Sequence, residues 1–325
     1  MADTEHSVAP AAAIPDVSVV IVSWNVANLL VGCLDSLVRC ADGLALEVWV
    51  VDNASSDNSV ELVRSRYPWV HLIANEDNRG FARANNQAIR QARGRFVLIL
   101  NPDTVVQAGA LGGLYRFLAE HGEVGMVGPR LVDGNGEIWE MCARRLFTMS
   151  TAFWFEGLCV HGVPRLGRWA LRRLWTPYDF EVTQEVECLS GAAMLVRREL
   201  LQDLQGFGEM FQHCGEDLDL CFRTRAAGWK IYYDANATIV HLIGRSEEQD
   251  ESRCHIDSIL GNEEYLVRCY GRLHGRLYRL MNRCVCLPRV LVVGIVKSLA
   301  GAQSRAAWLE RLKVARFLCR WKKPT

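Results

Sequence analysis

Several signals that would fix the class of this 325-residue chain are missing from it. No G-x-G-x-x-G follows the first apolar run and no G-x-x-x-x-G-K-[ST] occurs anywhere, so neither a dinucleotide-binding fingerprint nor a P-loop is indicated. The 12 cysteines contain no C-x-x-C, which argues against a zinc site and against a thioredoxin-type redox site. We therefore expect structural thiols in a reducing compartment.

Charge and hydropathy exclude further classes. The formal net charge is zero, so no basic excess indicates a nucleic-acid partner. Residues 1–15 are polar, acidic and rich in Pro and Ala, without the basic and apolar stretches of a signal peptide, and predict a flexible leader on a cytoplasmic protein. Pro288, Arg289 and Lys297 interrupt the best membrane-span candidate, at 284–301, so no run of about 18 uncharged apolar residues exists.

The end of the chain is nevertheless strongly basic. From Tyr265 onward, Glu310 is the only acidic residue among many Lys and Arg, and we treat 251–325 as a basic amphipathic helical extension. The segments 284–301 and 306–323 resemble helices that lie on an anionic membrane surface, which would place the protein peripherally on the inner face of a membrane. A helical pair that packs on the core and exposes a solvated basic face explains the pattern equally well.

Apolar runs alternate with amphipathic segments from residue 17, which is the pattern of β-α-β units and a parallel sheet. We predict an α/β domain over 16–250, with an open, mostly parallel sheet flanked by helices. The predicted strands are 17–24, 46–52, 70–74 and 95–100. The predicted helices are 26–39 with Asn25 as its cap, a second that opens near Asp57 and ends at Arg66, and 80–94 with Gly94 as its stop.

Polar residues follow each predicted strand at its carboxyl end. They are Ser23 and Asn25, Asp52 and Asn53, Asn75 to Asn78, and Asn101 and Asp103. One Asp after a strand often only forms a turn, but ligands of open α/β sheets bind where several such loops meet. Without a glycine loop, a nucleotide diphosphate must be neutralised in another way, and a divalent cation held by Asp103 would do so.

The second half of the sequence has a different pattern of predicted elements. Residues 125–140 predict a strand, a turn and a returning segment, and 141–180 a substrate-covering insertion. Residues 186–201 predict a strand and a short helix. A loop, a helix and two strands are then predicted up to residue 241. Glu216, Asp217 and Asp219 fall in the first turn of that helix, which ends at Gly228. Acids there stabilise a helix without any chemistry, and Asp219 has Arg223 four residues on as a partner.

Seven segments together carry a resemblance to a known family. They are VSVVIVSWN, VVDNASSD, NEDNRGFARANNQAI, LILNPDT, LSGAAMLVRREL, GEDLDLCFRTRAAGW and IVHLIGRS, in this order over about residues 16–246. The set resembles the family 2 glycosyltransferases of the GT-A fold, and most of all the rhamnosyltransferase-like members that build bacterial surface polysaccharides. Because seven motifs occur in register, the resemblance is specific.

The resemblance implies a role for each matching position. Asp52 would contact the base or ribose of the donor, with Ser23 and Asn25 nearby. The stretch that would line the nucleotide pocket comprises Asn78, Arg79, Gly80, Asn85 and Asn86. Asp103 would be the metal-binding acid of an Asp-x-Asp motif whose first acid is replaced here by Asn101. His241 would be an additional metal ligand, although a hydrogen-bonded histidine at a strand end is the simpler alternative.

The chemistry is consistent with these roles. Mg²⁺ or Mn²⁺ binds through one or two protein carboxylates when a diphosphate completes the shell. A metal-stabilised leaving group needs no protonating acid, so one carboxylate that deprotonates the acceptor suffices. Successive helical residues point about 100° apart. Asp219 has a local partner and Glu216 is placed to meet helix N–H groups or the metal shell, so Asp217 is predicted to be the free carboxylate and the general base.

The predicted activity is a metal-dependent, inverting transfer of a sugar. The donor would be dTDP-rhamnose or a UDP-hexose, and the acceptor a saccharide or lipid-linked saccharide. Two alternatives remain at this point. A sugar nucleotidyltransferase shares the sheet but needs a Gly-rich loop after the first strand, where this chain has SWNVANLL. A non-catalytic saccharide-binding or assembly subunit would not need both Asp103 and Asp217.

Overall fold

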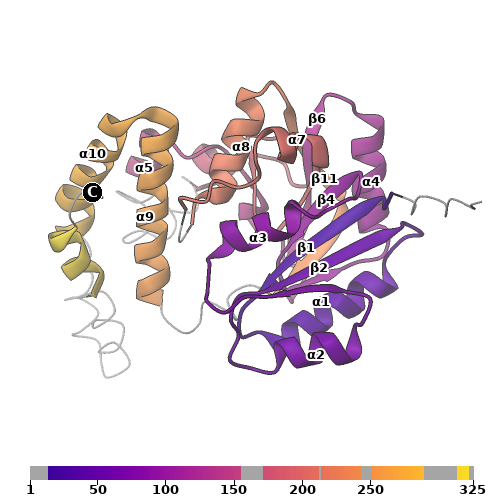
Figure 1. The fold of residues 1–325 in the computed structure, drawn as a ribbon. Coiled ribbons are helices and arrows are strands. Elements are labelled where there is room, and N and C mark those ends of the chain that lie inside the picture. Colours follow the sequence, from indigo (N-terminus) through magenta and orange to yellow (C-terminus); the bar gives the residue numbers. More distant parts are fainter. Residues whose placement is uncertain (1–13, 155–170, 212–213, 243–250, 289–312, 322–325) are drawn as a thin grey trace, which may run out of the picture.

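A twisted mixed sheet forms the centre of the computed structural model, which describes residues 14–154, 171–211, 214–242, 251–288 and 313–321 (Figure 1). The strand order is β3-β2-β1-β4-β10-β6-β11-β5, with β8 paired to β11. Strands β1 to β4 are parallel to one another, β10 runs antiparallel to β4 and β6, and β11 is parallel to β6 but antiparallel to β5. The prediction of an α/β domain around an open, mostly parallel sheet is confirmed, and the antiparallel pairings involve β10, β5 and β8.

The strands follow the apolar runs of the sequence. They are β1 Val17–Ser23, β2 Leu46–Asp52, β3 His71–Ala74, β4 Phe96–Leu100, β5 Thr104–Val106, β6 Val124–Val132, β8 Gln184–Glu185, β10 Ala193–Arg197 and β11 Lys230–His241. A separate pair consists of β7 Ala143–Arg144 and β9 Cys188–Leu189. Every residue of β1 and β4 is buried, because helices cover both faces of a sheet at its centre.

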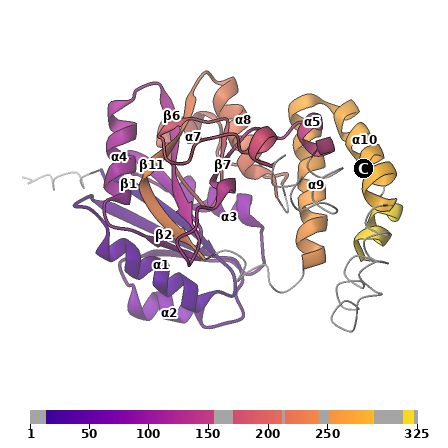
Figure 2. The same cartoon turned by 180° about the vertical axis from the view of Figure 1, so that it is seen from behind.

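Helices α1 and α2 cover one face of the sheet, while α3, α7 and α8 lie on the other side (Figures 1 and 2). Their bounds are α1 Ala27–Arg39, α2 Ser59–Arg66, α3 Phe81–Ile89, α4 Ala110–Glu120, α5 Met149–Ala152, α7 Arg198–Asp203 and α8 Glu216–Ala226. Short irregular helices lie at Glu140–Cys142, Leu171–Trp175 and Asn282–Cys286.

The basic extension packs beside this core as α9 Glu251–Tyr270 and α10 Arg272–Met281. Figure 1 shows both helices at one end of the molecule. The Phe222 ring of α8 meets Tyr265 of α9 edge-on at 6.3 Å, and Arg279 of α10 forms a 2.5 Å ion pair with Glu263 of α9. No helix in the described ranges is both long and apolar enough to cross a bilayer. Most of the two segments predicted to lie on a membrane, 284–301 and 306–323, falls outside the described residues.

Three local predictions were wrong. Asn25 does not cap α1: its φ is +55°, and the helix starts without a side-chain cap. Helix α3 ends at Ile89, and Gly94 is needed for another reason, because a Cβ there would lie 2.4 Å from the backbone nitrogen of Ser18. The two strands expected before residue 241 are one strand, β11, whose register against β6 shifts between Asp234 and Thr238.

Candidate active site

The pairing of β5 with β11 brings Asp103 and His241 together. His241 lies opposite Thr104 in this antiparallel ladder, and the Leu242 N–H donates a 2.9 Å hydrogen bond to the Asp103 carbonyl. As a result, His241 Nε2 is 3.3 Å from Asp103 Oδ1, and both side chains are 8% exposed. The other ring nitrogen, His241 Nδ1, is buried and has no hydrogen-bond partner in the described chain.

These two side chains fit a divalent cation that is shared with a ligand. A carboxylate oxygen and an imidazole nitrogen are suitable donors for Mn²⁺, and a carboxylate suits Mg²⁺. No cluster of three or more His, Cys, Asp or Glu residues that could hold a metal occurs in the described ranges. Two protein donors leave most of the coordination shell to water and phosphate oxygens, which is how Mg²⁺ is usually held beside a nucleotide.

A second group of polar atoms lies where β1 and β2 end. Ser23 pairs with Asp52 in the parallel register, so the two side chains are neighbours at the carboxyl edge. Asp52 Oδ1 accepts a 2.9 Å hydrogen bond from the Ser55 N–H. Asp52 Oδ2 and Ser23 Oγ are buried and have no partner in the part of the chain that the structure describes. Because buried polar groups are normally paired, these two atoms are candidates to bind a ligand.

Asn25 and Asn53 organise the loops above these strands. Asn25 Oδ1 accepts hydrogen bonds from the Ser56 N–H at 2.6 Å and from its hydroxyl at 3.1 Å. Asn53 donates to Asn78 Oδ1 at 3.0 Å and accepts from the Arg79 N–H at 3.1 Å. Asn25, which was predicted to lie near the sugar donor, therefore holds a loop. Asn53, which the sequence placed among the polar residues at the strand ends without a specific role, shapes the turn before α3.

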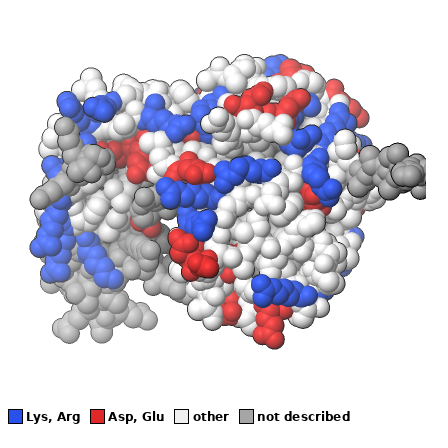
Figure 3. Space-filling model, in the orientation of Figure 1, with Lys and Arg blue, Asp and Glu red and all other residues white. Residues whose placement is uncertain are grey.

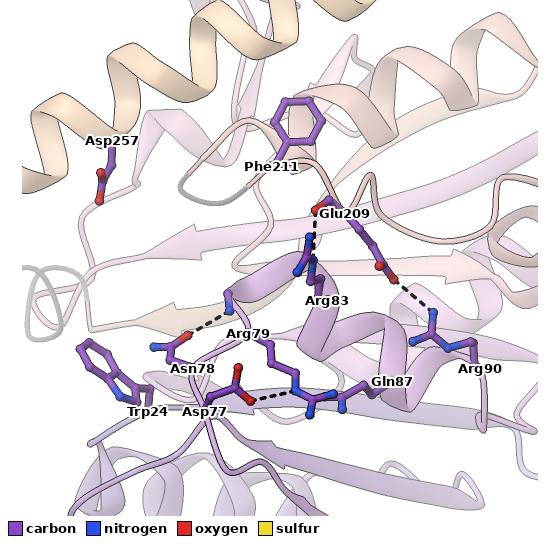
Figure 4. Close-up of a pocket in the computed structure, with 11 residues that line it drawn as sticks. Trp24, Asp77, Asn78, Arg79, Arg83, Gln87, Arg90, Glu209, Phe211 and Asp257 are labelled. Carbon is purple, nitrogen blue, oxygen red and sulfur yellow. Dashed lines mark hydrogen bonds and ion pairs between the residues drawn. The ribbon is translucent and has the colours of Figure 1, made fainter. Parts of the chain in front are cut away.

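That turn borders an open cavity of about 790 Å³. Figure 4 shows side chains from the residue after β1, the turn, α3, the loop before α8 and α9 around it. The lining residues are Trp24, Asp77, Asn78, Arg79, Gly80, Arg83, Gln87, Arg90, Glu209, Phe211 and Asp257. Three of the predicted nucleotide-pocket residues, Asn78, Arg79 and Gly80, are thus part of one cavity. Trp24, which is 48% exposed, was missed, although its place directly after β1 was a usable signal.

Asn85 and Asn86 do not line this cavity. Asn85 is fully buried and donates to the Phe81 carbonyl at 3.0 Å. Asn86 exchanges hydrogen bonds with the backbone of Phe207, at 2.9 Å in both directions, and donates to Glu209 at 3.1 Å. The bond from Asn86, followed by that from Arg90, lowers the pKa of Glu209 below its usual value. Both asparagines therefore connect α3 to its surroundings rather than to open space.

Asp217 is not the free carboxylate that the sequence predicted. Its Oδ2 lies 2.6 Å from Nη2 of Arg144, a buried residue on β7, and also accepts the Gly191 N–H at 3.3 Å. Burial has the largest single effect and lowers the pKa of Arg144, but the charge and hydrogen bond of Asp217, together with the nearby Cys188 and Cys221, raise this pKa above its ordinary value. The prediction failed because Arg144 is distant in the sequence and reaches Asp217 only through the pairing of β7 with β9.

Glu216, by contrast, has a strongly perturbed side chain. Burial first, and then the negative charge of Asp217, raises the pKa of Glu216 to about 8. By solvent accessibility, Glu216 is only partly buried. A carboxylate with a pKa near neutrality can accept a proton and release it again, so Glu216 is a second candidate for proton transfer. The predicted pairing of Asp219 with Arg223 is confirmed, at 2.7 Å, and Asp219 is fully buried.

A chain of backbone contacts joins the acidic turn of α8 to the metal candidates. Gly191 donates to Asp217, and the next residue, Ala192, accepts a 2.9 Å hydrogen bond from the Asn101 N–H. Asn101 is half-buried and lies two residues before Asp103. These contacts connect Asp217 of α8 to the loop that carries Asn101 and Asp103.

Comparison with known proteins identifies the family. The sequence model described as Glycosyl transferase family 2 matches residues 18–205, more than half of the chain. The chain belongs to this family. This family 2 glycosyltransferase is 28% identical over 221 residues to N-acetylglucosaminyl-diphospho-decaprenol L-rhamnosyltransferase of Mycobacterium tuberculosis, covering 63% of this chain and 69% of that protein. It is 26% identical over 275 residues to the succinoglycan biosynthesis protein ExoO of Rhizobium meliloti, and this match covers 83% of this chain and 73% of that protein.

Solved structures establish the fold of this glycosyltransferase. The mannosyltransferase PcManGT from Pyrobaculum calidifontis, in complex with GDP-Man and Mn²⁺, superimposes with a TM-score of 0.58 at 20% identity, over 98% of this chain and 92% of that one. GalNAc-T7 with UDP, GalNAc and Mn²⁺ gives a TM-score of 0.54 at 17% identity, over 70% of this chain and 43% of that one. The predictions of the GT-A fold and of a glycosyltransferase are confirmed, and a sugar nucleotidyltransferase and a non-catalytic subunit are set aside.

Proposed function

We propose that this glycosyltransferase is metal-dependent and inverting, and that it moves a sugar from a nucleoside-diphosphate donor to a hydroxyl group of a saccharide or lipid-linked saccharide. The observation that supports this most is the buried contact of Asp103 with His241 at the carboxyl edge of the sheet, 3.3 Å apart. Both residues are suitable ligands for Mn²⁺ beside a diphosphate, and the Asp103 carboxylate also suits Mg²⁺. The two structural neighbours named above contain Mn²⁺.

The donor would lie along the rim from β2 to β5. Asp52 Oδ2 and Ser23 Oγ would accept and donate hydrogen bonds to the nucleoside, since neither has a partner in the described chain. The turn of Asn78, Arg79 and Gly80 would cover it from the cavity side. Asp103 and His241 would hold the cation, with Asn101 beside them. When bound, that cation would act as a Lewis acid that stabilises the departing diphosphate.

The carboxylate of Asp217 would act as the general base. It would take the proton of the acceptor hydroxyl as the acceptor oxygen forms a bond to the anomeric carbon. The bond from that carbon to the diphosphate oxygen breaks at the same time, and the diphosphate keeps the electron pair. Arg144 and the Gly191 N–H would orient Asp217, which has both oxygens engaged in hydrogen bonds. Glu216 is the competing base because of its raised pKa.

The donor sugar would be rhamnose or a hexose, and the product a bacterial surface polysaccharide. The support is the printed activity of one relative, an L-rhamnosyltransferase, and the name of another, a succinoglycan biosynthesis protein. A decaprenol-linked acceptor of the first relative motivates a lipid-linked acceptor here, which would bring the enzyme to the inner surface of a membrane.

Incubation with a panel of nucleotide sugars tests this proposal. We expect slow, Mn²⁺- or Mg²⁺-dependent release of the nucleoside diphosphate from one donor, dTDP-rhamnose or a UDP-hexose, and faster release when a saccharide acceptor is added. Equal turnover of that donor in excess chelator would rule out the metal dependence. No turnover of any nucleotide sugar, by a protein whose fold is intact by circular dichroism, would reject the proposed activity.

A further inference from the structure

Helix α10 carries a row of exposed leucines. Leu273, Leu277 and Leu280 are 63%, 44% and 58% exposed, although large apolar side chains are normally buried. Their spacing of four and three residues places them within about 60° of the helix circumference, because successive residues are about 100° apart. The row is therefore one continuous apolar stripe.

A basic row lies next to this stripe. Arg272 and Arg276 are exposed, and the same helical spacing places them in the sector that adjoins the leucines. The opposite side of α10 is already occupied: Tyr278 is fully buried, and its ring meets Phe147 at 6.0 Å and Trp321 at 6.3 Å. The inner face of α10 thus fixes the helix on the protein, and the outer face presents leucine beside arginine.

The chain segments that carry and flank this outer face are basic. Neither 265–288 nor 313–321 contains an Asp or a Glu. The segment 313–321 packs beside α10, since Arg283 Nε donates to the Leu318 carbonyl at 3.2 Å, and it adds the exposed Arg316 and Arg320. Figure 3 shows blue Lys and Arg side chains over this end of the molecule, where Figure 1 places α10.

We infer that this outer face of α10 docks the protein on an anionic lipid surface. An interfacial helix needs leucines that enter the acyl boundary and guanidinium groups at the level of the lipid phosphates, and α10 presents both rows side by side. The sequence predicted membrane contact for the basic helices after Tyr265, with 284–301 and 306–323 as the main candidates, and the leucine row of α10 was not singled out. A second copy of the chain is a poor occupant, because a symmetric pair would bring two basic rows together.

The inference rests on the proposed function in one respect, because a lipid-linked acceptor would require the enzyme to bind a membrane surface. Lipid binding needs no turnover, so it is measured separately from the activity. Co-sedimentation of the full chain with vesicles tests it. We expect binding to phosphatidylcholine vesicles that contain phosphatidylglycerol, little binding to phosphatidylcholine alone, and release by salt. Changing the three leucines together to serine should weaken binding by about tenfold or more. The double variant Arg272→Glu and Arg276→Glu should weaken binding and remove most of its salt dependence.

Matched control variants lie on the other helical layer. Val38→Ser on α1 removes an apolar side chain that is 60% exposed, and the pair Arg39→Glu and Arg64→Glu reverses two exposed arginines on α1 and α2. We expect wild-type binding from these. Equal binding to neutral vesicles, or binding that neither α10 variant changes, would overturn the inference. So would a dimer, seen by light scattering, that the leucine variant dissociates. The arginine variant keeps the test valid if the leucine variant fails to fold.

Discussion

Arg268 of α9 lies 2.6 Å from Asp219 of α8, its Nε against Oδ1 of a carboxylate that is fully buried. The same helix pair meets again at Gly261, where a Cβ would lie only 2.0 Å from the Cys214 carbonyl, just before α8 begins. The C-terminal extension therefore fixes the start of α8, which carries Glu216 and Asp217. The extension supports the candidate base even though it contributes neither carboxylate.

Replacing Asp219 should act on stability first. Asp219→Asn removes the charge that Arg223 and Arg268 share, and we expect the free energy of unfolding to fall by about 3 kcal/mol, since breaking a buried pair leaves uncompensated charge. Denaturant unfolding measures this. Asp203→Asn, on the exposed end of α7, is the control and should change stability by less than about 0.5 kcal/mol. If donor turnover is lost with unchanged stability, Asp219 acts in the chemistry instead.

Loss of Asp103 should abolish metal binding while the fold persists. We expect Asp103→Ala and His241→Ala each to weaken Mn²⁺ binding in the presence of a nucleoside diphosphate, and to lower turnover by about 100-fold or more. Mn²⁺ paramagnetic resonance gives a readout that is independent of activity. Asp203→Ala, which removes an exposed carboxylate on α7, should bind the ion as wild type does. Wild-type Mn²⁺ affinity in Asp103→Ala would contradict the site.

The two neighbouring carboxylates can be separated by turnover. Asp217→Asn should lower the single-turnover rate by about 10² to 10⁴ while donor affinity stays nearly unchanged, because the donor contacts lie on other loops. Arg144→Lys should lower the rate less, since the charge beside Asp217 is kept. If Asp217→Asn turns over normally and Glu216→Gln is inactive, the base is Glu216. Full activity in both variants would leave the acidic turn with only a capping role.

The raised pKa of Glu216 makes a prediction about stability and pH. Its pKa of about 8 in the folded protein exceeds its ordinary value of 4.5, so the folded state binds more protons between these values. The stabilisation from protonated Glu216 should be complete below pH 4.5 and should be lost as the pH rises through 8. Urea unfolding of Glu216→Gln against wild type across this range measures it. Glu199→Gln, at an exposed position of α7, is the control, and the difference between its stability and that of wild type should not change with pH.

Two glycines provide an internal test of packing. Gly94→Ala would place a Cβ 2.4 Å from the Ser18 nitrogen, in a strand that cannot shift, and we expect a loss of about 2 to 4 kcal/mol of stability. Gly32→Ala on α1 meets nothing within 4 Å and should stabilise the protein by up to about 1 kcal/mol. Thermal unfolding of both variants decides the matter. Equal effects would mean that the backbone at Gly94 relaxes freely.

Most of the sheet could be predicted from the sequence, but only part of the candidate site could. Strands β1, β2 and β4 are apolar runs with polar residues at one end, and such patterns are local. The ion pair between Asp217 and Arg144 depends on the pairing of β7 with β9, which no spacing in the sequence reveals. Gly94 was assigned to a helix end because glycine is common there, whereas its actual reason is a close approach to Ser18, seventy-odd positions away in the chain. Tertiary contacts of this kind are invisible to local patterns.

Strand β11 is synthesised last among the strands of the sheet, and this affects when the candidate metal site can form. Asp103 is made early, but its neighbour His241 is at the end of the last strand of the sheet, which pairs with both β6 and β5. A shift of one residue in that pairing would turn His241 to the opposite face. A partly folded chain therefore lacks the metal candidate site altogether. Capture of a nucleotide sugar with its cation would report that the sheet has closed in register, and it would favour the finished fold over every incomplete one.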